Sequence, residues 1–548
     1  MIEEGFMYLD FKVKMNDIIG NTTQTVTGKN GTVYVYLEIS RKYDAAKKQS
    51  KPLRKCIGKI DPDNHDMLIP NDKFLVYQPD YFVPDADSSD YRSVCLKIGA
   101  HVLVSTVFNR LGLTSILDEL FDEREKIFIR DLVTYSVVTE GHSTLPYIPY
   151  AYDHPSEEPD MRICSYGDLS MFFANITAEQ IETFFDLWKK SYDHQDMIYL
   201  FSRDMDSDDD MTKKVAIAYE GSGLPLYYES YSTALSNHNQ YCYLNSMAHY
   251  RGYDNVCFVF NNGTEQQLSL LEELGCDFLT HYRAYDDSIK GTIKKYLNDV
   301  EAKSRNHIKK YDAYGITVEE ESKYIHIYHK INKKALVAFE EKLAAVERAL
   351  HLEAGQMISC LSDDEFVTNY FTIDYDPQDP SVFSVTRKED AIMERKALSH
   401  YFVLVSSKKM NATQALTIYN CQDEHERVMI KDKCFLDKNS ISYSSELFIE
   451  YLALIVRQKI HSVLQKENGS KKKGSQPMSV QQVIQQLDKI ILMEGQDGIY
   501  RLHHELTRKQ KEILNLFGMD QRDIRLSAND MSFRLNEVKL RNLIKKEN

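Results

Sequence analysis

The sequence lacks the segments that would carry a protein into or across a membrane. Its longest apolar run, Leu447 to Val456, is interrupted by Glu450 and has about half of the roughly 20 residues that a membrane-spanning helix requires. The N-terminal residues Met-Ile-Glu-Glu have neither the basic start nor the apolar block of a signal peptide. We therefore expect no transmembrane helix and a cytoplasmic location.

Patterns for metals, disulfides and the commoner catalytic sites are missing as well. The nine cysteines contain no C-x-x-C pair and are widely spaced, which argues against a zinc site and against a disulfide framework. The 17 histidines never form H-E-x-x-H. The sequence also has no Gly-rich phosphate loop, no G-x-S-x-G elbow and no recognisable Cys/His arrangement. We expect reduced thiols and no histidine metal site.

An excess of positive charge is absent too, because 67 Lys and Arg residues face 82 Asp and Glu residues and give a net charge of −15. Proteins that bind nucleic acid normally present a basic surface, so any such surface must here be local. Two stretches could supply it, residues 41–59 and the tail from Arg522 onward. The first contains the cations that we take as candidate DNA-binding residues: Arg41, Lys42, Lys47, Lys48, Lys51, Arg54 and Lys55. A solvated polar face is the alternative interpretation.

A chain of 548 residues exceeds the size of a single hydrophobic core, so we expect several domains. The first of them, at the N-terminus, shows the pattern of a β-hairpin. In residues 31–44, apolar side chains such as Val33, Val35 and Leu37 alternate with polar ones, which is typical of a strand. Residues 51–61 make a plausible partner strand. We assign this partly basic hairpin to an N-terminal domain of residues 1–95.

The next stretch, residues 96–195, has helical periodicity and is expected to form a helical, DNA-binding domain. Its clearest helix is 177–190, where Thr177 and Gln180 form a capping box. Further helices are predicted at 100–111, 114–121 and 127–138.

Beyond residue 196 the elements alternate in an informative order. Strands are predicted at 197–202, 214–220, 226–232, 255–261 and 277–282, with helices at 239–251 and 264–274. Three strands, then helix, strand, helix and strand, is the order of an RNase H-like core that lacks only its last helix. Other α/β folds share part of this order.

The remaining residues complete a multidomain α/β protein with a large insertion. The core is expected to comprise residues 196–283 and 412–465, with its missing helix at 412–434 and another helix at 444–464 that packs onto it. Residues 284–411 are the insertion, with a strand at 323–329, a helix at 335–352 and a strand at 400–406. A flexible basic linker, 466–477, leads to a C-terminal unit and tail, 478–548.

The segment IYNCQDEHERVMIKDK, residues 418–433, makes the assignment more specific. It resembles the YREK signature of the insertion-sequence-four superfamily of DDE transposases: Tyr, two residues, Arg, three residues, Glu, six residues, Lys. Here these positions hold Tyr419, Gln422, Glu426 and Lys433, so three of the four match. Steps of three, four and seven keep the four side chains near one stripe of a helix.

Other stretches are similar to the same family in matching order. They are YLEISRKYD with CIGKID, LGLTSILDELF, GLPLYYE, GYDNVCFVF and SSELFIEYLALIV, and together they span roughly residues 30–515. The resemblance implies a protein that cuts and joins the ends of double-stranded DNA, acting on two ends as a homodimer. It further implies two Mg²⁺ or Mn²⁺ ions held by Asp, Asp and Glu, with Glu426 as the third ligand. Two such ions about 3.5–4 Å apart need ligand negative charge to offset their repulsion.

The sequence departs from the family at the other two ligands. The first aspartate ends the first core strand, where this chain has Ser202, and the second precedes a glycine by two residues, where it has Asn261. Neither side chain supplies charge. Asp204 or Asp206 could replace the first ligand if the strand end shifts, although the acidic run around them is typical of a solvated loop.

Three interpretations therefore remain open. The chain is a degenerate or repurposed transposase relative that keeps the scaffold and DNA contact, an active metal-dependent transposase that uses Asp204 or Asp206, or a cytoplasmic protein-interaction module without nucleic-acid function. The degenerate relative needs no cofactor, whereas the active enzyme needs Mg²⁺ or Mn²⁺.

Overall fold

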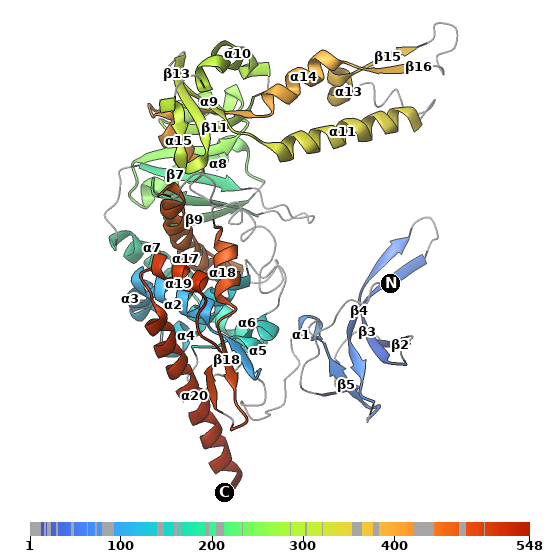
Figure 1. Ribbon diagram of the computed structural model, residues 1–548, viewed down its shortest axis with the longest axis vertical. Helices are drawn as coiled ribbons and strands as arrows, with labels where there is room; N and C mark the ends of the chain where they lie inside the picture. The colour runs from blue at the N-terminus through green and yellow to red at the C-terminus, as the bar shows by residue number, and fades with distance from the viewer. Residues whose placement is uncertain are drawn as a thin grey trace. The chain divides into compact units, whose positions relative to one another are not determined.

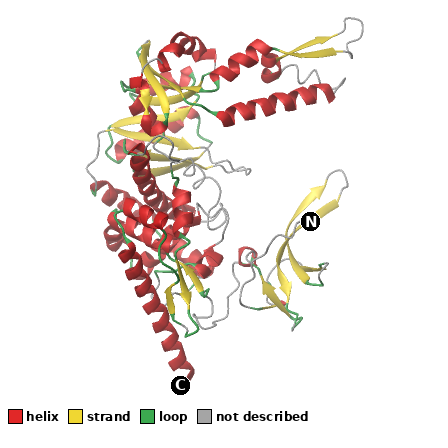
Figure 2. Cartoon of the chain, in the orientation of Figure 1, coloured by secondary structure: helices red, strands yellow, loops and turns green. Residues whose placement is uncertain are grey.

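The computed structural model shows a multidomain protein of mixed α/β structure (Figures 1 and 2). It describes residues 12–15, 18, 23–28, 31–44, 49–62, 64–71, 74–78, 93–139, 147–157, 163, 166–191, 197–203, 213–232, 234–284, 287–301, 304–320, 322–352, 364–375, 383–420, 443–470, 478–497 and 499–547. The chain divides into two compact units. Unit 1 comprises residues 1–193, 423–467 and 474–548, and unit 2 comprises residues 194–422 and 468–473.

The N-terminal part of unit 1 contains a five-stranded antiparallel sheet in the order β1-β5-β4-β3-β2. Its elements are β1 (Val13–Lys14), β2 (Thr23–Thr27), β3 (Val33–Asp44), β4 (Gln49–Ile60), β5 (Met67–Pro70) and the short helix α1 (Phe74–Tyr77). The predicted hairpin is confirmed as β3 and β4, which pair from Tyr34 and Lys59 to Asp44 and Gln49. Val35 and Leu37 are buried, as their alternation predicts.

Helices form the next part of unit 1. They are α2 (Gly99–Arg110), α3 (Leu113–Leu120), α4 (Glu123–Thr139), α5 (Tyr147–Asp153), α6 (Tyr166–Asn175), α7 (Ala178–Lys190) and α17 (Tyr443–Ser470). The predicted helices of this region are all present, and Thr177 and Gln180 form the expected capping box of α7. In the part of the chain that the structure describes, no single helix is long and apolar enough to cross a membrane; α2 and α3 reach that length only as a pair bent by 74°.

Helix α17 departs from its predicted place. The sequence predicts a helix at 444–464 that packs onto the α/β core, yet the structure assigns residues 443–467 to unit 1. The reason is aromatic packing: the Phe448 ring lies 5.1 Å from that of Phe184, and the Tyr451 ring lies 5.5 Å from that of Phe185, both in α7. The helix also continues to Ser470, into the range expected as a flexible linker.

The C-terminal segment packs against the helices of unit 1 and is not a separate body. It contains α18 (Val480–Leu487), β18 (Ile491–Glu494), β19 (Tyr500–Leu502), α19 (Arg508–Leu516) and α20 (Gln521–Glu547). Strand β18 pairs with both β19 and β6 (Cys95–Lys97), so residues about 400 positions apart share one sheet. At Gly99 a Cβ atom would collide with the backbone oxygen of Leu487, so the absence of a side chain allows this close approach.

Unit 2 is built on a nine-stranded sheet in the order β12-β13-β14-β17-β11-β10-β7-β8-β9. Its first elements are β7 (Met197–Arg203), β8 (Lys213–Tyr219), β9 (Pro225–Ser232), α8 (Asn237–Tyr250), β10 (Asn255–Asn261), α9 (Glu265–Glu273) and β11 (Asp277–Arg283). The predicted order of three strands, helix, strand, helix and strand is thereby confirmed. Strand β8 runs antiparallel to both β7 and β9, whereas β10 and β11 run parallel to β7.

The range expected as one insertion, 284–411, divides between the sheet and a separate projection. The elements that continue the sheet or lie beside it are α10 (Asp287–Glu301), η3 (Ser304–Asn306), β12 (His307–Ile308), η4 (Lys309–Tyr311), β13 (Ala313–Glu320), β14 (Lys323–His329) and β17 (Tyr401–Ser406). Helix α15 (Ala412–Tyr419) follows directly after this range. Strand β17 pairs antiparallel with both β11 and β14, which attaches these strands to the central sheet.

The projection, whose helices and strands are drawn in Figure 1, has a small hydrophobic core of its own. It contains α11 (Lys333–Leu352), α13 (Glu365–Tyr370), β15 (Phe371–Tyr375), β16 (Phe383–Arg387) and α14 (Glu389–Leu398). Phe339, Leu343, Val367, Phe371 and Ile392 are buried together there. All three elements predicted within residues 284–411 are present. The strands at 323–329 and 400–406 are β14 and β17 of the central sheet, and the helix at 335–352 is α11 of the projection.

Candidate functional site

The ends of strands β7 and β10 lie side by side in the sheet of unit 2. The two strands are parallel, and their register pairs Val259 with Phe201. Ser202 follows Phe201 by one residue, and Asn261 follows Val259 by two. The carboxyl ends of parallel strands are where open α/β sheets commonly place their binding sites. The structure thus places two of the three expected ligand positions at neighbouring strand ends.

A residue of the signature segment reaches this edge. The Tyr419 hydroxyl at the end of α15 donates a hydrogen bond to Oδ1 of Asn261, with an O···O distance of 3.0 Å. The Tyr419 ring is stacked on the ring of His281 in β11, with centroids 5.4 Å apart and planes 15° apart. These two contacts bring the start of the signature to a strand end that is 158 residues away in the sequence.

Helix α15 is itself fixed to the sheet. It begins with a capping box between Asn411 and Gln414, and the Tyr328 hydroxyl of β14 donates a 2.6 Å hydrogen bond to the backbone oxygen of Ala412. The structure describes the predicted helix 412–434 only over 412–420. Gln422, Glu426 and Lys433 lie outside the described residues, as do Asp204 and Asp206.

The turn after β10 holds Asn261 in place. Asn262 has a φ of 53°, and its N–H donates to the backbone oxygen of His281 at 2.8 Å. The Gly263 N–H donates to Oγ1 of Thr280 at 3.0 Å, and a Cβ at position 263 would lie 2.7 Å from the Phe260 ring. Glycine is therefore required for this close packing. Because the backbone is fixed by these contacts, an isosteric Asn→Asp change at 261 fits without rearrangement.

The described residues at this edge do not make a divalent-metal site. Asn261 offers a neutral amide oxygen that already accepts the Tyr419 hydrogen bond. Throughout the described part of the chain, no three His, Cys, Asp or Glu side chains are grouped so that they could hold a metal ion. A pair of divalent cations needs several anionic oxygens to offset mutual repulsion. The neutral pair Ser202 and Asn261 does not provide them.

The basic hairpin forms a two-stranded ribbon. Strand β2 pairs with β3 only as far as Leu37, and β5 pairs with β4 only between Gly58 and Ile60. Among the described strands, residues 38–44 and 49–57 therefore pair only with each other, and we call them the ribbon. A two-stranded ribbon is one of the elements that the major groove of DNA admits.

The charges of the ribbon are partly compensated. Glu38 is 8% exposed, and its carboxylate lies 2.6 Å from Nε of Arg41 and 3.7 Å from a guanidinium nitrogen of Arg54. Lys51 and Lys55 are exposed on the same ribbon. Lys42 belongs to β3, where its backbone pairs with Lys51, whereas Lys47 and Lys48 lie outside the described residues. Two of the seven candidate DNA-binding cations thus already share an acid.

A buried charge cluster in unit 1 has no counterpart among the sequence motifs. The Glu157 carboxylate lies 3.2 Å from the Arg130 guanidinium and 3.5 Å from Nε2 of His101, and its backbone N–H donates to Asp131 at 2.7 Å. Asp131 also accepts a hydrogen bond from the Ser156 hydroxyl. We call these five residues the buried cluster. Its sequence signal is the acidic residue Asp131 in a helix whose other buried residues are uncharged.

Burial and charge shift the acids of this cluster in opposite directions. Burial, together with the nearby Glu157 charge, raises the pKa of Asp131 to about 6. Burial also opposes ionisation of Glu157, but the hydrogen bond and charge of His101 and the charge of Arg130 outweigh it and lower the pKa of Glu157 to about 2. The cluster joins α2, α4 and the segment after α5, which indicates a structural role.

Comparison with known proteins adds no relative: no protein-family model matches the chain, and a search of curated proteins finds no significant match.

Proposed function

We propose that this chain is a transposase-family protein whose RNase H-like scaffold persists while its metal site is degenerate, and that it binds duplex DNA without cutting it. Its proposed role is therefore recognition, related to DNA transposition by descent. The observation that carries the proposal is the hydrogen bond from Tyr419 to Asn261. It connects the signature segment with the strand end at which the family resemblance puts the second metal ligand.

The strand order supports the same assignment. Part of the sheet has the order β9-β8-β7-β10-β11. In it, β8 is antiparallel to both of its neighbours, and β10 and β11 run parallel to β7. Helix α8 precedes β10, and helix α9 precedes β11. An RNase H-like core has this order and directionality. Its first and fourth strands correspond to β7 and β10, which end beside Ser202 and Asn261.

Charge decides between the degenerate and the active interpretation. A two-metal centre acts by clamping the attacking and leaving oxygens, and each missing carboxylate leaves part of the repulsion between the ions uncompensated. Ser202 and Asn261 are both neutral. We therefore expect no measurable Mg²⁺-dependent strand cleavage by the unmodified chain. The active alternative depends on Asp204 or Asp206 and on a second ligand other than residue 261.

Restoring the charge tests the proposal directly. We expect the double substitution Ser202→Asp and Asn261→Asp to increase Mn²⁺ binding, measured by calorimetry and by electron paramagnetic resonance of the bound ion. The matched control, Ser222→Asp with Asn255→Asp, adds the same two charges. Those residues lie in the β8–β9 turn and at the opposite end of β10. An equal gain in both double variants would contradict the assignment of residues 202 and 261 to one site.

The activity assay gives the opposite test. Cleavage or strand transfer on duplex DNA by the unmodified chain, abolished by Glu426→Ala or by Asp204→Asn, would overturn the degenerate interpretation. No cleavage together with restored metal binding in the double variant supports it. Transposition itself is not expected to return, because Gln422 also stands where the family signature has Arg.

The proposed DNA contact is through the ribbon. Each neutralised phosphate contributes about −0.9 to the slope of log affinity against log salt, so roughly four contacts give a slope near −3 to −4. Replacing Lys47, Lys48, Lys51 and Arg54 with Ala should flatten this slope. If the unmodified chain does not bind duplex DNA even at about 50 mM salt, the third alternative, a protein-interaction module, becomes the better explanation.

A further inference from the structure

Residues 507–535, in unit 1, form two helices joined by a tight turn. Helix α19 (Arg508–Leu516) begins with a capping box between Thr507 and Gln510. Gly518 then adopts a φ of 60°, and its N–H and that of Met519 donate to the backbone oxygens of Asn515 and Leu514, each at 3.0 Å. A glycine in this left-handed conformation is the common way to end a helix.

The second helix starts immediately after this turn. The Asp520 carboxylate accepts hydrogen bonds from the backbone N–H groups of Arg522 and Asp523 at 2.6 and 3.3 Å, and the Asp520 N–H donates to Asp523 at 2.7 Å. These bonds cap the first turn of α20 (Gln521–Glu547). Only four residues, 517–520, thus separate the two helices, which is the connection of a helix-turn-helix motif.

Buried apolar residues fix the motif in place. The residues that are buried occur on both helices and in the turn, namely Ile513, Leu514, Phe517, Met519, Ile524, Ala528, Met531 and Leu535. On α20 they recur at steps of four, three and four, so they occupy one stripe of the helix. The opposite stripe remains available for a partner.

The exposed stripe of α20 carries side chains suited to reading base edges. Arg522 and Asn529 are exposed, and Leu526 and Phe533 are 61% and 69% exposed. Steps of four, three and four put these four residues on one face of the helix. Arg commonly pairs with guanine, Asn pairs with adenine, and apolar groups contact the thymine methyl group.

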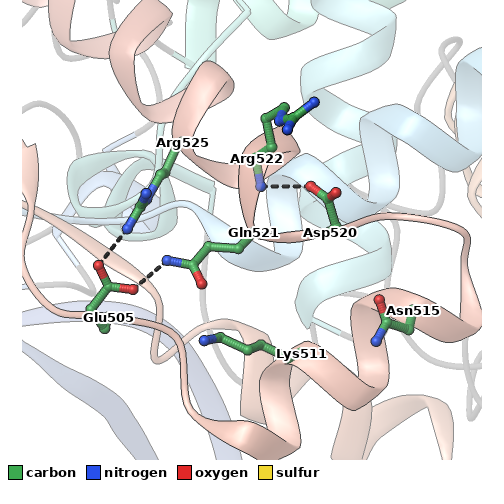
Figure 3. A pocket seen from close by; sticks show the side chains of 7 residues that line it. All are labelled: Glu505, Lys511, Asn515, Asp520, Gln521, Arg522 and Arg525. Carbon is green, nitrogen blue, oxygen red and sulfur yellow. Dashed lines mark hydrogen bonds and ion pairs between the residues drawn. The ribbon is translucent and has the colours of Figure 1, made fainter.

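A hollow between the two helices adds two cations, Lys511 and Arg522, that form no salt bridge with the described residues (Figure 3). It is lined by Glu505, Lys511, Asn515, Asp520, Gln521, Arg522 and Arg525. Its acids are occupied within the protein: Glu505 binds Gln521 and Arg525, and Asp520 caps α20. Within the described residues, neither Lys511 nor Arg522 forms an ion pair with an acid. The positive end of the α20 dipole also lies here.

We propose that residues 507–535 are a DNA-binding helix-turn-helix that places α20 in the major groove of duplex DNA. Arg522 and Asn529 face the base edges, and Lys509 and Lys511 of α19 bind the adjacent backbone phosphates. Lys509 is exposed and, like Lys511, has no ion pair among the described residues. This surface is separate from the ribbon, and the inference does not depend on the fate of the metal site.

Salt dependence with paired variants tests the phosphate contacts. The full chain is titrated with a fluorescent duplex pool of random sequence across a range of salt concentrations. Lys509→Ala with Lys511→Ala removes two proposed phosphate contacts and should flatten the log–log slope by about 2. Lys333→Ala with Lys334→Ala, two exposed lysines at the start of α11 in unit 2, removes the same charge and should leave the slope unchanged.

Sequence selection tests the reading face. Duplexes enriched by the full chain should share a short motif, and Asn529→Ala should weaken discrimination at one position by about tenfold with little change in the salt slope. Because Asn529 is exposed, the circular dichroism spectrum and Tm should remain those of the unmodified chain.

The outcomes separate this inference from the ribbon contact. If Lys51→Ala with Lys55→Ala flattens the slope and the α19 variant does not, the helix-turn-helix proposal is overturned and the ribbon alone binds DNA. Equal affinity for single-stranded and duplex pools, or the same selected motif with Asn529→Ala as without it, also overturns the proposal. If the slope becomes flatter both in the ribbon pair and in the α19 pair, and the control pair leaves it unchanged, the result supports two separate DNA contacts.

Discussion

The strand-end edge of unit 2 and the buried cluster of unit 1 differ in the charge of their polar side chains. At the strand ends, where the proposed transposase ancestry would place carboxylates, the chain has Ser202 and the neutral, exposed amide of Asn261. In the buried cluster, where no chemistry is expected, Asp131 and Glu157 are kept with His101 and Arg130. Removal of a buried charge would leave its partners uncompensated, whereas the charge of an exposed strand-end residue can change at little cost to the fold.

The largest effect expected from this contrast is on the stability of unit 1. Glu157→Ala leaves His101 and Arg130 without their shared acid, and we expect the free energy of unfolding to fall by about 3 kcal/mol. Unfolding is followed in denaturant by the fluorescence of Trp188, the single tryptophan, which is buried in α7 of unit 1. The control is Glu123→Ala, which removes the ion pair of an acid whose side chain is 81% exposed. A comparable loss in the control would contradict a special role for the buried cluster.

The two units should also respond to pH in opposite directions. Burial raises the pKa of Asp131 to about 6, so its contribution to stability is complete below about 3.8 and is lost as the pH rises through 6. His154 in the same unit acts likewise: burial lowers its pKa, but hydrogen bonds with Asp153 and Asp488 outweigh burial and raise it above 6.5. Unit 1 should therefore become more stable as the pH falls from 8 to 5.

Unit 2 should lose stability over the same range. His326 is fully buried between Thr317 and Ser406, and burial lowers its pKa to about 4. Its contribution is complete above 6.5 and is lost as the pH falls through 4. We expect opposite changes of about 1–2 kcal/mol, followed by Trp188 fluorescence for unit 1 and by hydrogen exchange of β14 and β17 amides for unit 2. Asp131→Asn should remove much of the response of unit 1 alone; parallel responses of both units would refute the contrast.

Sequence patterns specified local structure well, because local periodicity and capping determine it. The strands β7 to β11 and the box of Thr177 and Gln180 follow directly from such patterns. Pairing between distant segments does not: nothing in the sequence indicates that β17 lies between β11 and β14, or that β18 pairs with β6. For the same reason the aromatic contacts that hold α17 in unit 1 were not predictable.

For the candidate site too, local motif spacing was informative, whereas contacts that depend on strand register could not be predicted. The motif spacing singled out Tyr419 and Asn261 from two separate stretches, and the structure joins them by a hydrogen bond. The compensation of Arg41 and Arg54 by Glu38 depends on the register of two strands, with a bulge between Glu38 and Ser40, that alternation alone does not specify. A count of cations therefore overstated the free charge of the ribbon.

A smaller effect is expected at the strand ends themselves. Tyr419→Phe removes one hydrogen bond to an exposed amide, so the free energy of unfolding of unit 2 should change by no more than about 1 kcal/mol. Hydrogen exchange of the β10 amides measures this change. Tyr328→Phe is the contrasting variant, because the Tyr328 hydroxyl is buried and bonded to the Ala412 backbone oxygen, and it should cost more. A larger loss with Tyr419→Phe would mean that the strand-end contact is structural and would weaken its connection with the proposed degenerate metal site.

The smallest effect concerns the acid within the ribbon. Glu38 compensates Arg41 and Arg54, so Glu38→Gln keeps the shape of the side chain and releases about one unit of positive charge for phosphate. If the ribbon contacts duplex DNA, the slope of log affinity against log salt should become steeper by about 0.9 or less, and affinity at low salt should rise. Glu273→Gln, an exposed acid of α9 in unit 2, changes the net charge of the chain equally and serves as control. An equal increase in both variants would show that overall charge is responsible. An increase restricted to Glu38→Gln would show that the ribbon acts through its local charge, even though the whole chain carries −15.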